Sequence, residues 1–286
     1  MVGVCELLLI YTPFSYCNRN NLGDLNKKHY FCIRNICVYM EYELYRTVLI
    51  LGAVINFLIA FALLHNNVYF SIYDVYHRSR SLVALNYTIF GIGFLLHVWF
   101  GWRISCPAAA SALTVSYFHS GGVLFGWSHI SLMRPDYLSR RIVIRDLSIL
   151  AIGLVAYWTI MADWAFLIFF IHASYIVFTF YRTYFKVRRS IVMMPADDHA
   201  PSWWTVETKQ TVLGFHHSFV IACHLIVFFG LGSVAITAAF PYDIWPYILL
   251  MLAGIAVFCF IFYSLVEYGN IIYAATNATE DAVKLT

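Results

Sequence analysis

Charged side chains are scarce in this chain, and their scarcity decides which solvent surrounds it. Only 12% of the 286 residues are Asp, Glu, Lys or Arg, whereas 62% are hydrophobic. Soluble domains carry roughly 25% charged residues. A chain so poor in charge cannot cover its folded surface with groups that water solvates, so we expect the lipid bilayer to be its main partner. The net charge of +3 also excludes the basic surface that direct nucleic-acid binding needs.

Catalytic and metal-binding motifs are also lacking. The sequence contains no HExxH, no GxSxG, no phosphate-binding glycine loop and no CxxCH. It has no CxxC either, and Cys106, Cys223 and Cys259 stand singly, so we expect no disulfide framework among them. These absences give little support for catalysis.

What the sequence does contain is a series of long apolar runs. A helix needs about 20 such residues to cross a bilayer, and seven runs qualify. They are continuous rather than alternating, which excludes a strand barrel. We therefore predict an all-α polytopic membrane bundle of seven transmembrane helices, at Tyr45–Leu64, Ser81–Trp102, Ala108–Ser131, about 144–161, about 164–183, about 213–239 and about 244–268.

The basic residues predict the orientation of these helices, because Lys and Arg are retained in cytoplasmic loops. One set of alternate loops, with the C-terminal tail, carries nearly all of them, and the opposite loops carry only Arg103. We therefore expect the N-terminus outside and the C-terminus inside. Tryptophans at the predicted outer helix ends agree with an interfacial belt: Trp99, Trp102, Trp158, Trp164 and Trp245.

The segment 1–39 fits this topology poorly, because its basic residues would lie outside. We interpret it as a leader of doubtful status, with translation beginning at Met40; the alternative is a real external cap closed by disulfides. The seven-helix domain then spans 40–268. The tail 269–286 is a short cytoplasmic segment, and it leaves room for a separate cytoplasmic regulatory partner.

Histidines inside the predicted spans are the candidate site residues, because a polar group at mid-membrane generally faces the bundle interior and has a partner. Four lie at similar mid-membrane depth: His97, His119, His172 and His224. A second tier of polar candidates lies nearer the inner face: His129, His216, His217 and Glu267.

Three interpretations of these histidines stay open. Each imidazole could simply hydrogen-bond a neighbouring helix. Several from different helices could bind a metal ion or haem, with zinc as the other cofactor alternative. They could also form a proton- or ligand-responsive site, since histidine titrates near neutral pH.

Small residues and basic pairs add two further hypotheses. Gly122 and Gly126 have the GxxxG spacing that permits close helix contact, and Gly121 and Gly122 could instead open a small cavity beside His119. The arginine pairs Arg140–Arg141 and Arg188–Arg189 could hold anionic lipid headgroups, although setting the topology explains them equally. A homodimer is one alternative for the assembly.

Two stretches, SRSLVALNYTIFGIGFLLHVWFGWR and ALTVSYFHSGGVLFGWSHISLMRPDYLSRR, resemble the membrane portions of bacterial seven-helix proteins of the sensor type. Some members of that group carry a cytoplasmic helix-turn-helix domain after the seventh helix. The resemblance implies a bacterial inner-membrane location and a sensing role. This chain ends at Thr286 without such a domain, and the resemblance assigns no site residue.

Two functions compete at this point. In the first, the protein is a non-enzymatic sensor or signal-coupling module, in which a small or lipophilic cue shifts helix packing around His119, His172 and His224. In the second, it is a membrane redox enzyme that uses haem or a metal ion bound by the mid-membrane histidines.

Overall fold

A computed structural model describes the backbone of residues 25–65, 74–134, 136–159, 162–193 and 206–284. Side chains are described for residues 40–65, 76–134, 136–159, 164–189 and 219–266. Within these ranges every regular element is a helix, which confirms the all-α prediction. The elements are α2 (Leu25–His65), α3 (Asp74–Phe100), α4 (Trp102–Ser105), α5 (Pro107–Phe125), the π-helical turn η2 (Gly126–Ile130), α6 (Ser131–Met133), α7 (Arg140–Thr159), α8 (Ala162–Met193), α9 (Val206–Ala239) and α10 (Trp245–Lys284).

Six of the described helices are long and apolar enough to cross a membrane, and they make the chain a multi-pass membrane protein. Their exposed faces carry large apolar side chains such as Leu58, Ile152, Phe178 and Phe228, which suit contact with lipid rather than water. The six candidate spans are Met40–His65, Tyr76–Phe100, Arg140–Thr159, Trp164–Arg189, Phe219–Ala239 and Trp245–Val266.

The third predicted span, Ala108–Ser131, is not among these six, so the predicted count of seven is not confirmed. Its regular α-helix, α5, ends at Phe125, where the π-helical turn begins. The polar His119 further lowers the hydropathy of α5. The run from Pro107 to Met133 is nevertheless helical without a break, as α5, η2 and α6 in turn.

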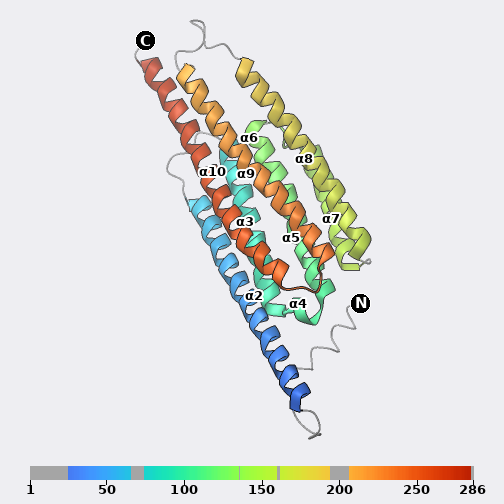
Figure 1. The fold of residues 1–286 in the computed structure, drawn as a ribbon. Helices are drawn as coiled ribbons and strands as arrows, with labels where there is room; N and C mark the ends of the chain where they lie inside the picture. The colour runs from blue at the N-terminus through green and yellow to red at the C-terminus, as the bar shows by residue number, and fades with distance from the viewer. Residues whose placement is uncertain (1–24, 66–73, 135, 160–161, 194–205, 285–286) are drawn as a thin grey trace.

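Helix α5 occupies the middle of the bundle, where it contacts α3, α7, α8 and α9. The other helices close around it, α2 packing on both α3 and α10, and α8 on both α7 and α9 (Figure 1). Most α5 side chains are buried as a result. A helix surrounded by protein needs fewer apolar side chains than one facing lipid, which explains why this segment carries Ser, Gly and His.

An aromatic cluster packs α3 against α5 and α10. The Phe90 ring makes edge-on contacts with Phe118 and Phe258, with 5.2 Å between ring centroids in each case. Two tyrosines of α3 donate hydrogen bonds to α10 carbonyls, Tyr87 to Phe258 at 2.8 Å and Tyr76 to Leu265 at 3.0 Å. These contacts fix α3 and α10 as one wall of the bundle interior.

Two helices run beyond the predicted domain boundaries. Helix α2 begins at Leu25 and passes through Met40, and α10 continues past residue 268 to Lys284. Residues 1–24 of the proposed leader lie outside the described residues. Of the cysteines expected to stand singly, Cys223 and Cys259 are free thiols, but Cys106 is disulfide-bonded, contrary to the expectation.

Candidate functional site

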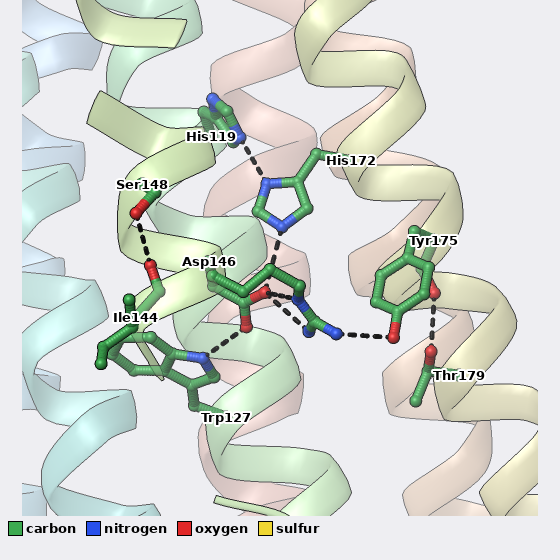
Figure 2. Close-up of polar contacts among 9 residues, drawn as sticks. His119, Trp127, Ile144, Asp146, Ser148, His172, Tyr175 and Thr179 are labelled. Atoms are coloured by element: carbon green, nitrogen blue, oxygen red, sulfur yellow. Dashed lines mark hydrogen bonds and ion pairs between the residues drawn. The ribbon is translucent and has the colours of Figure 1, made fainter. Parts of the chain in front are cut away.

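A chain of hydrogen-bonded polar side chains runs through the interior of the bundle between α5, α7 and α8. The Tyr157 hydroxyl lies 2.8 Å from Nδ1 of His119, and Nε2 of His119 lies 2.9 Å from Nδ1 of His172. Nε2 of His172 then lies 3.4 Å from Oδ1 of Asp146. Figure 2 shows the two imidazoles in line above the carboxylate. His119, His172 and Asp146 are each at most 2% exposed.

The Asp146 carboxylate is held from two further sides. Trp127, in the π-helical turn, donates its indole N–H to Oδ2 at 2.8 Å. Arg145 donates from Nε to Oδ1 at 2.8 Å and extends Nη1 to the Tyr175 hydroxyl at 2.7 Å (Figure 2). The Arg145 side chain is 34% exposed, so this series of hydrogen-bonded side chains ends at the surface of the bundle on this side.

The spacing of residues along α7 explains how this one helix contributes both ends of the hydrogen-bonded polar chain, Asp146 and Tyr157. Asp146, Gly153 and Tyr157 are separated by seven and four residues, and at 100° per residue they fall within about 40° of one another. All three are among the buried residues of α7. Over 11 residues the helix rises about 16 Å, so the chain extends over about half of a 30 Å hydrocarbon core.

Gly153 allows the polar chain to lie directly against α7, because it has no side chain. A Cβ atom at this position would lie 2.9 Å from the His119 ring and 3.0 Å from the Tyr157 hydroxyl. Any larger residue would therefore push both groups away from α7. The glycine is required here by close approach, because its missing side chain is what lets the imidazole and the phenol meet beside the helix.

A cavity of about 70 Å³ lies on the other side of α5, between α3, α8, α9 and α10. It is lined mainly by aromatic and aliphatic side chains, with the polar groups of Asn86 and His129 among them. Oδ1 of Asn86 is buried and has no hydrogen-bond partner in the described part of the chain. Gly122 and Gly230 line the same space, and a Cβ on either would meet nothing within 4 Å.

The glycines of α5 therefore have two different roles, close helix contact at some positions and an open cavity at another. Gly121 and Gly126 allow close packing, since a Cβ would lie 2.8 Å from Phe90 and 2.8 Å from Ile176 respectively. Gly122 instead lines the cavity, as the alternative interpretation expected, but His119 is not among the residues that line it. The predicted GxxxG pair Gly122 and Gly126 thus does not act as a single contact surface.

The π-helical turn Gly126–Ile130 touches both features. Its Trp127 binds Asp146 in the polar chain, and its His129 lines the cavity. Nδ1 of His129 lies 2.8 Å from the Ser128 hydroxyl and 3.2 Å from the Phe125 carbonyl, which fixes the ring. Single π-helical turns are rare and occur frequently at functional sites.

The structure brings together two of the four predicted mid-membrane histidines. His119 and His172 bond each other, whereas His97 bonds the Thr114 hydroxyl at 3.1 Å and His224 bonds the Val220 carbonyl at 2.6 Å. In the part of the chain with described side chains, no group of three or more His, Cys, Asp or Glu residues could hold a metal ion. A haem or zinc site built from all four histidines is therefore not supported by this geometry.

The remaining predicted residues are less informative. Of the inner tier only His129 has a described side chain; His216, His217 and Glu267 lie at helical positions outside the described side chains. Both proposed headgroup pairs are exposed, with Arg188 donating to the Tyr184 hydroxyl at 3.0 Å. Lipid binding by Arg140, Arg141, Arg188 and Arg189 stays a prediction.

Arg103, predicted as the one basic residue of the outer loops, is in fact buried at 2% exposure. Its guanidinium carbon lies 3.7 Å from the centroid of the Tyr247 ring. It donates to the Thr114 hydroxyl at 3.2 Å and the Pro241 carbonyl at 3.3 Å. This arginine therefore joins α4 and α5 to the connection before α10 and is not a solvated loop charge.

Sequence reasoning missed three members of the polar chain: Asp146, Trp127 and Tyr157. Asp146 was overlooked because it lies at the rim of its predicted span, where a carboxylate is easily taken as solvated. The sequence feature that could have indicated it is the spacing of Asp146, Gly153 and Tyr157. This spacing places a carboxylate, a residue without a side chain and a phenol on one face of an apolar helix.

Comparison with known proteins found no matching protein-family model, curated protein or solved structure. The resemblance to bacterial seven-helix sensors therefore rests on the two sequence stretches alone.

Proposed function

We propose that this protein is a membrane-embedded sensor that binds a small lipophilic molecule in the cavity between α3, α5, α8, α9 and α10. The observation that carries the proposal is the unpartnered Oδ1 of Asn86 beside an otherwise mainly apolar space. A buried carbonyl oxygen without a donor costs about 1–3 kcal/mol. A ligand that supplies an N–H or O–H inside the cavity would recover that energy.

Access to the cavity is available from the bilayer. Among the lining residues, Val177 of α8 and Ile226 of α9 are partly exposed on the bundle surface. A lipophilic molecule dissolved in the membrane can enter between these two helices without crossing water. The cavity of about 70 Å³ is well above the ~15 Å³ that one water molecule needs, and it suits a short chain or a small ring with one polar group.

The π-helical turn provides the route from the cavity to the rest of the bundle. A ligand that displaces His129 moves a turn whose Trp127 also holds Asp146. Because α6 follows directly and leads into the connection to α7, the displacement reaches the membrane surface there. We assign this surface to the cytoplasm, where a regulatory partner would detect the change.

The proposal includes the finer topology. Six spans together with the unbroken run α5–η2–α6 give seven crossings, with the N-terminus outside and the C-terminus inside a bacterial inner membrane. Its support is the central position of α5, whose run of 27 residues from Pro107 to Met133 is about 40 Å long by helical rise, more than the ~30 Å hydrocarbon core.

Ligand binding is tested with two probes that differ only in the presence of a hydrogen-bond donor. Purified protein in detergent is heated with a primary alcohol of four to eight carbons, or with the matching alkane, and unfolding is followed by circular dichroism. A site specific for the folded state raises the melting temperature saturably. We expect the alcohol to stabilise more than the alkane, Asn86→Leu to remove that difference, and Gly122→Leu to remove both effects. Equal, non-saturating effects of both probes would refute the proposal.

The haem or zinc alternative has a separate test. A purified sample that shows a Soret band, or stoichiometric zinc or iron, would support the redox enzyme in place of the sensor. Replacement of His119 by Ala would then also remove the cofactor.

A further inference from the structure

Four titratable side chains are joined end to end in the bundle interior, in the order Tyr157, His119, His172 and Asp146. The three junctions measure 2.8, 2.9 and 3.4 Å. No water or other molecule is needed to bridge any of them, since each is already within hydrogen-bond distance. Buried titratable groups in a membrane are expensive and are typical of proton relays and ion pathways.

The bonds of this chain have one internally consistent direction. An ionised Asp146 can only accept, so Nε2 of His172 donates to it and Nδ1 of His172 accepts. Nε2 of His119 then donates to His172, and its own Nδ1 accepts the Tyr157 hydroxyl proton. With both imidazoles neutral, every ring nitrogen is satisfied in this single arrangement of tautomers.

The same arrangement can carry a proton. When a proton reaches the Tyr157 oxygen, the hydroxyl proton passes to Nδ1 of His119, and the Nε2 proton of His119 passes to Nδ1 of His172. The Nε2 proton of His172 then passes to Oδ1 of Asp146. One proton has been taken up at Tyr157 and one has arrived on Asp146, while each imidazole has exchanged one N–H for another and stays neutral.

The two ends of the hydrogen-bonded chain lie in different surroundings, a small internal void at Tyr157 and the bundle surface at Arg145. At the Tyr157 end a void of about 10 Å³ is lined by Tyr157 together with Ser111, close to the space that one water molecule needs. Ser111 in turn lies 3.5 Å from Arg103. At the other end, the partly exposed Arg145 joins Asp146 to Tyr175, which is 44% exposed.

We propose that Tyr157, His119, His172 and Asp146 form a proton-transfer chain through the middle of the bundle, which makes proton movement a second activity of this protein. Asp146 receives the proton, its ion pair with Arg145 is neutralised, and Arg145 is then free to swing toward the surface with Tyr175. Water at that surface takes the proton from Asp146, which completes one transfer. Before the next transfer each imidazole gives its Nδ1 proton to water and takes one from water at Nε2, which restores the starting tautomers.

The other charged and titratable groups that face the chain are few. Arg145 comes from α7, and Tyr175 comes from α8. Tyr137, in the connection between α6 and α7, lies near Asp146 and Arg145, and burial raises its pKa. From α5 and η2 only His119 and the non-titrating Trp127 reach the chain. Arg145 is therefore the cation that pairs with Asp146.

The experiment measures proton flux in liposomes. Protein is reconstituted with a pH-sensitive dye inside, and a potassium gradient with valinomycin imposes a membrane potential of either sign. We expect wild-type flux at least about tenfold above that of protein-free liposomes, and Tyr157→Phe and His172→Gln to lower it at least about tenfold. Tyr157→Phe removes a single oxygen and is the variant least able to disturb folding.

Matched controls separate the chain from general damage. Tyr76→Phe removes a buried hydroxyl that donates to Leu265, and His224→Gln changes a histidine outside the chain. Both should keep the wild-type flux. The proposal is overturned if wild-type flux equals that of protein-free liposomes, if Tyr157→Phe and His172→Gln conduct like wild type, or if the controls lose flux equally. Ligand binding in the cavity is measured separately and does not enter these outcomes.

Discussion

Gly121 and Gly122 are neighbours in α5, yet a methyl group added to each would meet opposite surroundings. At Gly122 an added Cβ would contact nothing within 4 Å. At Gly121 it would lie 2.8 Å from the Phe90 ring and 3.0 Å from Oδ1 of Asn86. We predict that Gly122→Ala stabilises the protein and Gly121→Ala destabilises it.

The expected sizes follow from packing and helix propensity. Alanine is favoured over glycine inside a helix by about 1 kcal/mol. Filling a void adds about 24 cal/mol per Å³, so the whole cavity of about 70 Å³ sets an upper limit of about 1.7 kcal/mol. One methyl group fills part of it, and we therefore expect Gly122→Ala to raise the free energy of unfolding by about 1–2 kcal/mol.

At Gly121 the same helix propensity is outweighed by steric conflict. Phe90 cannot move aside easily, because its ring packs against Phe118 and Phe258 at 5.2 Å each. Overpacking a core costs about 1–3 kcal/mol. After the gain in propensity, Gly121→Ala should lower the free energy of unfolding by up to about 2 kcal/mol.

Reversible unfolding in mixed micelles, titrated with a denaturing detergent and followed by far-ultraviolet circular dichroism, measures both variants. The two positions share the same helix and depth, so each is the other's control for effects of lipid or propensity. Changes of the same sign and size at both positions would refute the cavity and the close contact together. Gly122→Ala should also weaken alcohol binding. If the variant is more stable but binds the alcohol as well as wild type does, the ligand binds elsewhere.

Three further outcomes are expected. Gly153→Ala should destabilise by about 1–3 kcal/mol and lower proton flux as Tyr157→Phe does, since its methyl would displace His119 and Tyr157; unchanged flux would contradict the role of Gly153. Asp146→Asn should cost about 1–3 kcal/mol by removing the charge that pairs with the partly exposed Arg145, and adding Arg145→Gln should recover part of the loss in detergent unfolding. Cysteines at Ser105 and Ser139 should react with an impermeant label from opposite membrane faces; labelling from one face would show that α5–η2–α6 does not cross.

The helical bundle could be predicted from the sequence because lipid imposes a simple rule on it. A backbone in hydrocarbon must satisfy its own hydrogen bonds, so each long apolar run becomes a helix. The rule is least informative for α5, because the helix faces protein on most sides and its composition follows packing. This is why the run containing His119 was predicted as a span yet is not among the six candidate spans.

The polar chain could be predicted only in part, because depth along a helix is readable from sequence while rotation relative to neighbours is not. His119 and His172, which were predicted to lie at similar depth, bond each other, but His97 and His224, the other two histidines of the predicted mid-depth set, join other partners. What separates the two pairs is that α5 and α8, which carry His119 and His172, pack against α7, whereas α3 and α9, which carry His97 and His224, pack mainly on other helices. That depends on close contacts such as the one at Gly153, which no single segment reveals.

Arg103 and Asp146 illustrate how a position near the end of a span can mislead about a charged residue. A charge there is readily taken as solvated, yet Arg103 lies over the Tyr247 ring and Asp146 lies beneath two imidazoles (Figure 2). Each is buried because neighbouring helices supply partners that water would otherwise provide. A charged residue at the end of a span therefore indicates a buried polar site when a small residue and a polar aromatic residue lie on the same face of its helix. Asp146 is such a case.

The cavity and the polar chain lie on different sides of α5, and the π-helical turn connects them. A regular α-helix places residues two apart on opposite faces, and within η2 this separates Trp127, which holds Asp146, from His129, which lines the cavity. Rearrangement of this π-helical turn into regular helix would rotate both side chains together. A ligand that favours one arrangement of the turn therefore changes how firmly Trp127 holds the carboxylate, and the two proposed activities become thermodynamically linked.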